Sequence, residues 1–232
     1  MVLQTKARAT PARPVRLDRS RHASPQVFEQ LRELILSLEL SPGTVLSRAE
    51  LAKQFGLSQT PIRDALIKLG EEGLVDIFPQ HATVVSRIDL TAAKQAHFLR
   101  KSIELEMVRT LAAEPSAALI AKLSAQIDLQ SAVMGADDYR DFVAADRAFH
   151  RLMYEAAGAP ELFDLVRRLS GHVDRLRRLH LPTAGKAQAV VRDHRRIVEA
   201  IAKGDPDAAQ ARLREHLSGT LGKVEEISAR NP

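Results

Sequence analysis

The sequence predicts a mainly α-helical fold in two parts, a small helical unit that ends in a β-hairpin and then a larger antiparallel helical bundle. Three observations predict it. Apolar residues recur at helical spacing along most of the 232 residues, the spacing changes to a period near two over residues 74–86, and the breaks between segments are short. The 45% apolar and 27% charged content is typical of a globular chain.

The first 22 residues carry most of the net charge. They hold six basic side chains against Asp18 alone, whereas the rest of the chain balances at 28 basic and 28 acidic residues. We predict that residues 1–22 form a disordered basic tail that can touch phosphates, with a solvated leader as the alternative.

Composition also narrows the environment of the chain. It has no cysteine, which excludes disulfides and thiolate metal sites and fits a reducing cytoplasm. No apolar run approaches the roughly 20 residues that a membrane span needs, and the N-terminus lacks the apolar core of a secretory signal. We therefore predict a cytoplasmic protein with no membrane partner.

The first two helices are predicted from their apolar stripes and their ends. Residues 24–40 carry apolar side chains at helical spacing and stop at the sequence SPG. A short helix follows over residues 47–56, where Ser47 and Glu50 form a capping box and Gly56 ends the helix.

A third helix and a hairpin complete the first unit. The third helix runs over residues 59–73, begins at Ser58 or Thr60 and tolerates Pro61 in its first turn. Two short strands with a turn around residues 79–82 follow. This order is a winged helix-turn-helix, which we place at residues 23–88.

The start of the third helix holds the candidate DNA contacts. In a helix-turn-helix the early residues of the second helix of the motif enter the major groove. Here they are Ser58, Gln59, Thr60 and Arg63, whose side chains can bind phosphate oxygens or base edges. Winged helices also bind proteins, and the near balance of acidic and basic residues in this unit keeps that alternative open.

The remainder, residues 89–230, is predicted to be an all-α antiparallel bundle of about six helices. Its segments are about 91–113, 116–134, 138–157, 160–181, 185–203 and 206–229. The last begins at a clear signal, with Gly204 after the preceding helix, Asp205 as N-cap and Pro206 at the first helical position. We assign the polar residues of the sequence GHVDRLRRLHL to a charged surface or a dimer-facing helix; they are His172, Arg175, Arg178 and His180.

Four ionisable residues lie on the apolar faces of three of these segments. Asp146 and His150 are four residues apart on one helix, and His194 and His216 occupy inward positions on two others. A single buried histidine is usually a hydrogen-bonded core residue. An aspartate and three neutral imidazoles together suit a divalent transition ion such as Zn, Ni, Mn or Fe, with a coordination position open for a carboxylate or for water.

The first unit resembles a known family. The sequence LRELILSLELSPGTVLSRAELAKQFGLSQTPIRDALIKLGEEGLV is similar to the DNA-binding domain of the GntR superfamily of bacterial repressors. The resemblance implies that Arg63 contacts operator DNA. Three positions depart from the family pattern. Gln59 stands where the family commonly has Arg, and His81 stands where the wing usually has Gly. The family often has Arg at the position of Ala49, whereas here Arg48 lies one position earlier. We count Arg48 and His81 among the predicted DNA contacts.

The bundle also carries a resemblance. The sequences ADRAFHRLMYEAAG, RDHRRIVEAIAKGD and ARLREHL are similar to the FCD effector domain of the FadR subfamily. Matched residue by residue, the resemblance implies that the metal ligands, next to an organic-acid site, are Asp146, His150, His194 and His216.

Two further expectations depend on the same resemblance. The sequence LRKSIELEMVRTLAA makes Arg100 a candidate for pairing with an effector carboxylate, with a salt bridge to Glu104 as the equal alternative. Ala159 stands where the family often has Asn, so one polar contact is missing. A count of six helices favours the VanR-like branch.

Together these features predict a ligand-responsive bacterial transcriptional regulator, a repressor and not an enzyme. We expect a homodimer, because such proteins read paired half-sites on double-stranded operator DNA, and a small carboxylate as effector. Two alternatives stay open: a metal-dependent enzyme in a helical bundle, and a regulator whose metal is purely structural.

Overall fold

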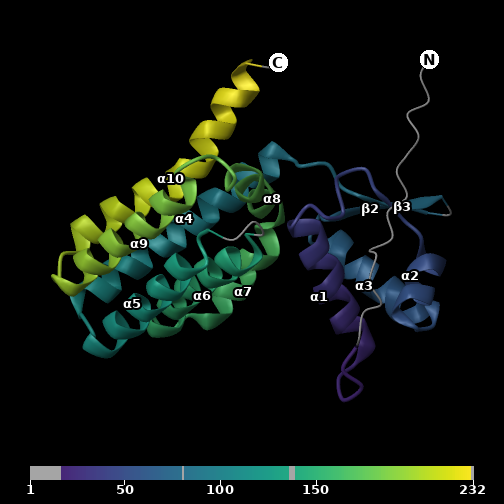
Figure 1. The fold of residues 1–232 in the computed structure, drawn as a ribbon, viewed down its shortest axis with the longest axis horizontal. Helices are drawn as coiled ribbons and strands as arrows, with labels where there is room; N and C mark the ends of the chain where they lie inside the picture. The colour runs from purple at the N-terminus through teal and green to yellow at the C-terminus, as the bar shows by residue number, and fades with distance from the viewer. Residues whose placement is uncertain (1–16, 80, 136–138, 231–232) are drawn as a thin grey trace. The chain divides into compact units, whose positions relative to one another are not determined.

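The computed structural model describes residues 17–79, 81–135 and 139–230 (Figure 1). The chain divides into two compact units, Met1–Leu90 and Thr91–Pro232. The first 16 residues of the predicted tail and the predicted helix start at residue 138 lie outside the described residues. In the part of the chain that the structure describes, no helix combines the length and apolarity needed to cross a bilayer.

The first unit is a winged helix-turn-helix, as predicted. Its elements are α1 (Ala23–Leu36), β1 (Val45–Leu46), α2 (Arg48–Phe55), α3 (Gln59–Glu71), β2 (Val75–Phe78) and β3 (Ala82–Val85). The strands form one antiparallel sheet in the order β1-β3-β2. Strand β1 was not predicted, because two residues are too few to show an alternating pattern.

Local signals in the sequence explain where the short helices begin and end. The Ser47 hydroxyl oxygen accepts a hydrogen bond from the Glu50 amide at 3.3 Å, which caps α2. Gly56 follows α2 with a φ of 64°, a left-handed conformation that favours glycine. The apolar faces of α1, α2 and α3 then form a core in which Leu31, Ile62 and Leu69 are completely buried.

The end of the predicted tail is ordered against α1. The Gln26 side chain is buried, and its amide nitrogen lies 2.9 Å from the Asp18 carbonyl oxygen and 3.1 Å from that of Arg21. Its oxygen accepts from the Asp18 amide at 2.8 Å. These bonds hold residues 18–21 in a turn, so this part of the tail differs from the predicted disorder.

The second unit is all-α and antiparallel, which confirms the predicted class. Its helices are α4 (Leu90–Ala113), α5 (Ala117–Ala132), α6 (Arg140–Ala156), α7 (Pro160–Leu169), α8 (Gly171–His180), α9 (Lys186–Ala202) and α10 (Pro206–Arg230). The predicted start of the last helix is present, since Gly204 has a φ of 67° and an Asp205 carboxylate oxygen accepts from the Ala208 amide at 2.9 Å.

One predicted helix is divided. Residues 160–181 form α7 and α8 with an interruption at Ser170. The Ser170 hydroxyl donates to the Val166 carbonyl oxygen at 2.7 Å, a side-chain bond that bends helices, and Gly171 follows it. The predicted six segments are therefore all present, one of them in two pieces.

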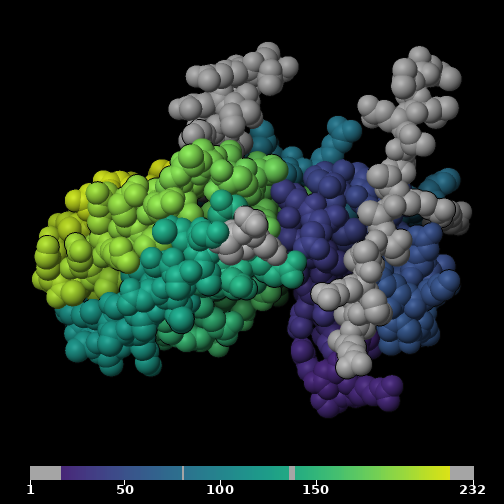
Figure 2. Space-filling view, in the orientation of Figure 1, coloured from purple at the N-terminus to yellow at the C-terminus, as the bar shows by residue number. Residues whose placement is uncertain are grey.

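The helices of this unit enclose a core of apolar side chains that also contains buried polar groups. Fully buried apolar side chains include Val108, Leu123, Phe149, Ile197 and Leu213. In the space-filling view the teal to yellow atoms of this unit cover its helices on the face that is shown (Figure 2). Polar groups buried in such an interior require partners.

Candidate functional site

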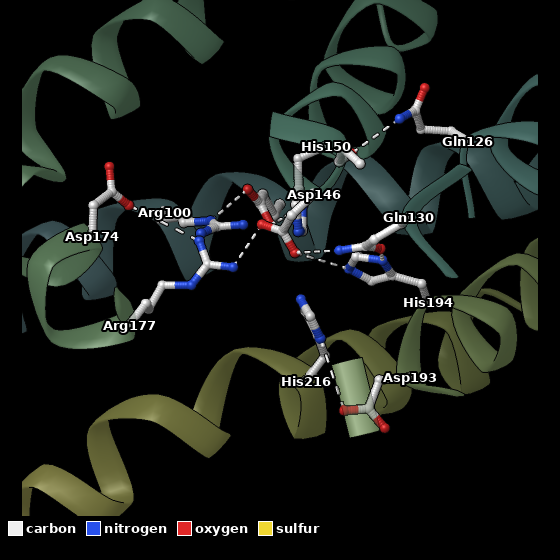
Figure 3. A network of polar contacts seen from close by, with 12 residues as sticks. Arg100, Gln126, Gln130, Asp146, His150, Asp174, Arg177, Asp193, His194 and His216 are labelled. Atoms are coloured by element: carbon white, nitrogen blue, oxygen red, sulfur yellow. Dashed lines mark hydrogen bonds and ion pairs between the residues drawn. The ribbon is translucent and has the colours of Figure 1, made fainter. Parts of the chain in front are cut away.

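The four predicted ligand-type side chains come together inside the helical unit (Figure 3). Asp146 and His150 lie on α6, His194 on α9 and His216 on α10, and their exposed fractions are 4%, 2%, 0% and 7%. One potential ligand atom from each residue can be chosen so that all four lie within 4.8 Å of one another. The cluster could therefore hold a metal ion.

Each histidine has a polar partner near its Nδ1 atom. The Glu104 Oε2 atom lies 3.2 Å from His150 Nδ1, and the Gln130 Oε1 atom lies 2.8 Å from His194 Nδ1. For His216, the nearest such atom is Asp193 Oδ2 at 3.8 Å. Only the His194 contact is a hydrogen bond, since the Nδ1 atoms of His150 and His216 have no hydrogen-bond partner among the described residues. This bond leaves the Nε2 atom of His194 available for a common centre.

Asp146 has two differently engaged oxygens. Its Oδ2 atom accepts from the Arg177 guanidinium on α8 at 2.6 Å. Its Oδ1 atom faces the other way and lies 3.6 Å from the Nε2 atom of His194. That nitrogen is buried and has no hydrogen-bond partner among the described residues.

The electrostatics keep these groups in the forms that bind cations. Burial raises the pKa of the Asp146 carboxyl, but the Arg177 guanidinium and the three neighbouring histidines together outweigh burial, and the net pKa lies well below the ordinary value. Burial lowers the pKa of His194 well below its usual range and also lowers the pKa of His216. At pH 7 the Asp146 carboxylate is therefore ionised, and the imidazoles of His194 and His216 are neutral.

The donor set fits a divalent transition ion. Bonds to imidazole nitrogen or carboxylate oxygen are about 2.0–2.2 Å long, so ligand atoms on one ion lie up to about 4.2 Å apart. The observed limit of 4.8 Å is close to this span. When the hydrogen of a neutral imidazole is on Nδ1, its Nε2 atom is a lone pair, and a cation between this nitrogen and a carboxylate oxygen satisfies both lone pairs.

A cavity of about 60 Å³ adjoins the cluster. Asp146 and His150 form part of its wall, and four arginines and three carboxylates line it. The arginines are Arg100, Arg147, Arg167 and Arg177, and the carboxylates are those of Glu104, Asp146 and Asp174. One water needs roughly 10–15 Å³ by this measure, so the space suits a small molecule.

Arg100 forms the predicted salt bridge to Glu104, and it also lies where it could contact an effector carboxylate. Its Nε atom donates to Glu104 Oε1 at 2.8 Å, which is the salt bridge given as the alternative. Arg100 also lines the cavity. Burial raises the pKa of Glu104, but Arg100 and His150 together outweigh burial and the net pKa is lowered, so Glu104 is ionised beside Arg100.

The prediction of a charged surface or a dimer-facing helix for α8 is wrong for two of its residues, which are buried within the chain itself. Arg175 is completely buried and His172 is 8% exposed, and an Arg175 guanidinium nitrogen lies 2.9 Å from His172 Nδ1. The high arginine content concealed an inward face, since a long side chain can bury its stem while its charged end finds a partner.

Sequence reasoning also missed Arg177 and Gln130, which both contact Asp146. Gln130 lies on the apolar stripe of α5 after Leu123 and Ile127, so the signal that marked the histidines was present there too. Arg177 carried no such signal, because its role depends on how α8 packs near α6 rather than on its own helix.

The predicted DNA contacts are at the surface of the winged helix-turn-helix. Ser58, Gln59, Thr60 and Arg63 are exposed at the N-terminal end of α3. Arg48 is exposed at the start of α2, and His81 is exposed between β2 and β3. The fold thus presents all six to solvent, and their individual roles stay predictions.

The fold and this exposed helix define a transcriptional regulator of the helix-turn-helix class. Residues 23–85 match the family described as bacterial regulatory proteins, gntR family, and residues 95–219 match the FCD domain. The chain therefore belongs to the GntR family and carries an FCD domain, as in FadR-like regulators. The first domain implies DNA binding, and the second implies effector binding.

Individual relatives agree with this assignment. The chain is 36% identical over 206 residues to a helix-turn-helix transcriptional regulator from an unstable DNA locus of Streptomyces ambofaciens, covering 89% of this chain and 86% of that protein. It is 29% identical over 206 residues to the transcriptional repressor RspR of Escherichia coli K12, covering 89% and 90%. These relatives are regulators, which agrees with the prediction that the chain is not an enzyme.

Solved structures show the same fold. Escherichia coli McbR/YncC aligns with a TM-score of 0.76 at 18% identity, covering 90% of this chain and 99% of that one. A regulator from Rhodococcus sp. RHA1 aligns with a TM-score of 0.72 at 19% identity, covering 88% and 97%.

Proposed function

We propose that this chain is a ligand-responsive transcriptional repressor. Its winged helix-turn-helix binds operator DNA through the start of α3, with Arg63 as the central contact. Its FCD domain binds a small organic acid beside a divalent transition ion, for which the ligands are Asp146, His150, His194 and His216. The protein acts in the bacterial cytoplasm as a homodimer.

One observation carries the metal centre. His194 Nε2 is buried without a hydrogen-bond partner and faces an ionised carboxylate oxygen at 3.6 Å. Leaving a buried polar atom unsatisfied costs roughly 1–3 kcal/mol. A bound divalent ion would remove this cost and supply an open coordination position to an acid in the adjoining cavity.

The cavity supports a small anionic effector. Its four arginines exceed its three carboxylates, and Asp146 and Glu104 already engage Arg177 and Arg100. A carboxylate entering next to the metal would face these guanidinium groups. We keep Arg100 as the proposed effector contact and add Arg177, which lines the same cavity.

Repression and the branch of the family are proposed from the comparisons and the fold. RspR of Escherichia coli and NanR of Cronobacter sakazakii, 27% identical over 230 residues, are both named repressors. Membership of the VanR-like branch depends on counting α7 and α8 as one interrupted helix, which gives six segments in the bundle.

A thermal-shift screen of small organic acids tests this function. The screen compares metal-loaded protein with protein stripped by a chelator. We expect at least one acid to raise the melting temperature of the loaded protein only, and the same acid to change its affinity for operator DNA.

Two other results would contradict parts of the proposal. An acid that stabilises loaded and stripped protein equally indicates a purely structural metal. Operator affinity that no bound acid changes contradicts the regulatory role, because a ligand shifts an equilibrium only by its differential affinity for the two states.

A further inference from the structure

Gln130 is a fully buried polar residue between two of the proposed metal ligands. It lies on α5, has an exposed fraction of 0% and contacts His194 of α9 and Asp146 of α6 (Figure 3). A buried amide without partners is costly, and both ends of this one are engaged. Its nitrogen donates to Asp146 Oδ1 at 3.5 Å, and its oxygen lies 2.8 Å from His194 Nδ1.

The orientation of this amide follows from the chemistry of its neighbours. An ionised carboxylate can only accept hydrogen bonds, so the NH₂ group of Gln130 must face Asp146. The amide oxygen is then left to His194, and since it can only accept, the Nδ1 atom of that histidine must carry the hydrogen. A neutral imidazole has one N–H, so its Nε2 atom is a bare lone pair.

That lone pair is directed at the centre of the cluster. His194 Nε2 has no hydrogen-bond partner among the described residues, and Phe149 stacks on the imidazole with ring centroids 4.0 Å apart. The stacking restrains the plane of the ring while Gln130 sets which nitrogen faces inward. One side chain therefore contacts both His194 and Asp146 Oδ1, while Arg177 holds the other oxygen of the same carboxylate.

The partners of the other two imidazoles differ in kind. Glu104 and Asp193, near His150 and His216, are carboxylates. Among the described partners of the three rings, Gln130 is the neutral one, and it also reaches the fourth ligand. A carboxylate at this position would lie against Asp146 with like charge, so the neutral amide is the group that can contact both ligands.

We propose that Gln130 is a positioning residue of the metal centre, which holds His194 in the Nδ1–H tautomer and Asp146 Oδ1 in a coordinating direction. This inference rests on the proposed metal function. Outer partners of metal ligands typically contribute 10–100-fold to metal affinity, so we expect a loss of roughly that size when the amide is removed.

The experiment uses full-length protein, stripped by a chelator and titrated calorimetrically with Zn²⁺. Gln130→Met keeps an unbranched side chain of similar size and removes both hydrogen bonds. Gln126→Met is the matched control, since Gln126 lies one turn earlier on α5 and donates at 3.3 Å to the Ala145 carbonyl oxygen instead of to a ligand. We expect Gln130→Met to weaken Zn²⁺ binding roughly 10–100-fold and Gln126→Met to leave it unchanged.

A second measurement needs no variant. Nitrogen-15 NMR of metal-free wild-type protein distinguishes the two imidazole tautomers, and we expect the Nδ1–H form for His194. A change of packing alone would not select a tautomer, so this signal separates positioning from a merely structural role. It also keeps the proposal testable if Gln130→Met does not fold.

The outcomes separate the two levels of the proposal. An Nε2–H tautomer in the wild type would overturn the role of Gln130, and so would wild-type Zn²⁺ affinity in Gln130→Met. Either result leaves the metal centre supported if His194→Ala loses Zn²⁺ binding. Unchanged Zn²⁺ affinity in His194→Ala would overturn the metal centre itself, and the role of Gln130 with it.

Discussion

The two units of this chain place their functional side chains in opposite environments. In the winged helix-turn-helix, the candidate contacts such as Gln59 and Arg63 are exposed, and the core beneath them is apolar. In the FCD domain, the candidate ligands such as Asp146 and His194 are inside the core. Exposed polar groups keep their hydration, whereas buried ones must satisfy one another or bind an ion. Stability and function are therefore separable in the first unit and coupled in the second.

The largest expected difference between the two units is in how truncation of a core side chain affects metal binding. Phe149→Ala removes a fully buried ring that stacks on His194, and Leu66→Ala removes a side chain that is 2% exposed in the other unit. Phe149→Ala should destabilise its unit by about 3–5 kcal/mol and Leu66→Ala by about 2–5 kcal/mol, measured by urea unfolding. We expect Phe149→Ala alone to weaken Zn²⁺ binding as well, and equal metal affinities for the two variants would contradict the coupling.

The second largest expected effect is a loss of stability of the FCD domain at acid pH. Burial lowers the pKa of His194 and His216, so below their ordinary value of 6.5 the unfolded chain binds more protons than the folded one. The free energy of unfolding of metal-free protein should therefore decrease as the pH falls. The expected decrease is up to about 1.4 kcal/mol for each histidine between pH 7.5 and 5.5.

Thermal unfolding of chelated protein across this pH range measures the effect. His81→Gln changes an exposed histidine of the other unit and is the control, which should keep the wild-type slope. The double substitution of His194 and His216 by Gln should flatten the slope. A slope unchanged by the double substitution would assign the acid sensitivity to other groups.

A contact on α3 should affect DNA binding without affecting stability. Arg63→Ala is expected to weaken operator binding by about 1–3 kcal/mol, measured by fluorescence anisotropy on a site selected from a random DNA library. Lys68→Ala removes an exposed cation near the other end of the same helix and is the control. If Lys68→Ala weakens binding as much as Arg63→Ala, α3 does not read DNA by its N-terminal end.

The smallest expected effect is on helix caps. The Ser47 hydroxyl caps α2, and the Ser116 hydroxyl oxygen accepts from the Leu119 amide at 3.4 Å at the start of α5. Alanine at either position should lower the melting temperature of its own unit, with a loss of about 1 kcal/mol. Neither cap contacts a candidate ligand, so a change in Zn²⁺ affinity in either variant would contradict the assignment of the site.

Sequence patterns predicted the features that depend on one segment at a time. Helix ends were predicted from the cap at Ser47, the left-handed Gly56 and the N-cap at Asp205. The four candidate ligands were predicted because they lie on the inward faces of three helices. The short strand β1 and the interruption at Ser170 were missed, because two residues show no period and a serine hydroxyl bond leaves no pattern.

Contacts between different helices were harder to predict from the sequence. Arg177 meets Asp146 only because the fold brings α8 within ion-pair distance of α6, and no spacing within either helix encodes this pair. Gln130 occupied a position that the stripe marked as inward, so buried amides deserve the same scrutiny as histidines when a polar cluster is sought. The tautomer of His194 depends on Gln130 and Asp146, which lie on two other helices, so no pattern within one segment predicts it.

The central claim is that Asp146, His150, His194 and His216 hold a metal ion. The most direct test is the metal content of full-length protein, measured by inductively coupled plasma mass spectrometry after loading with Zn²⁺ and desalting. We predict one ion per chain in the wild type and in Gln126→Met, and none in His194→Ala. Equal metal content in wild type and His194→Ala would contradict the claim.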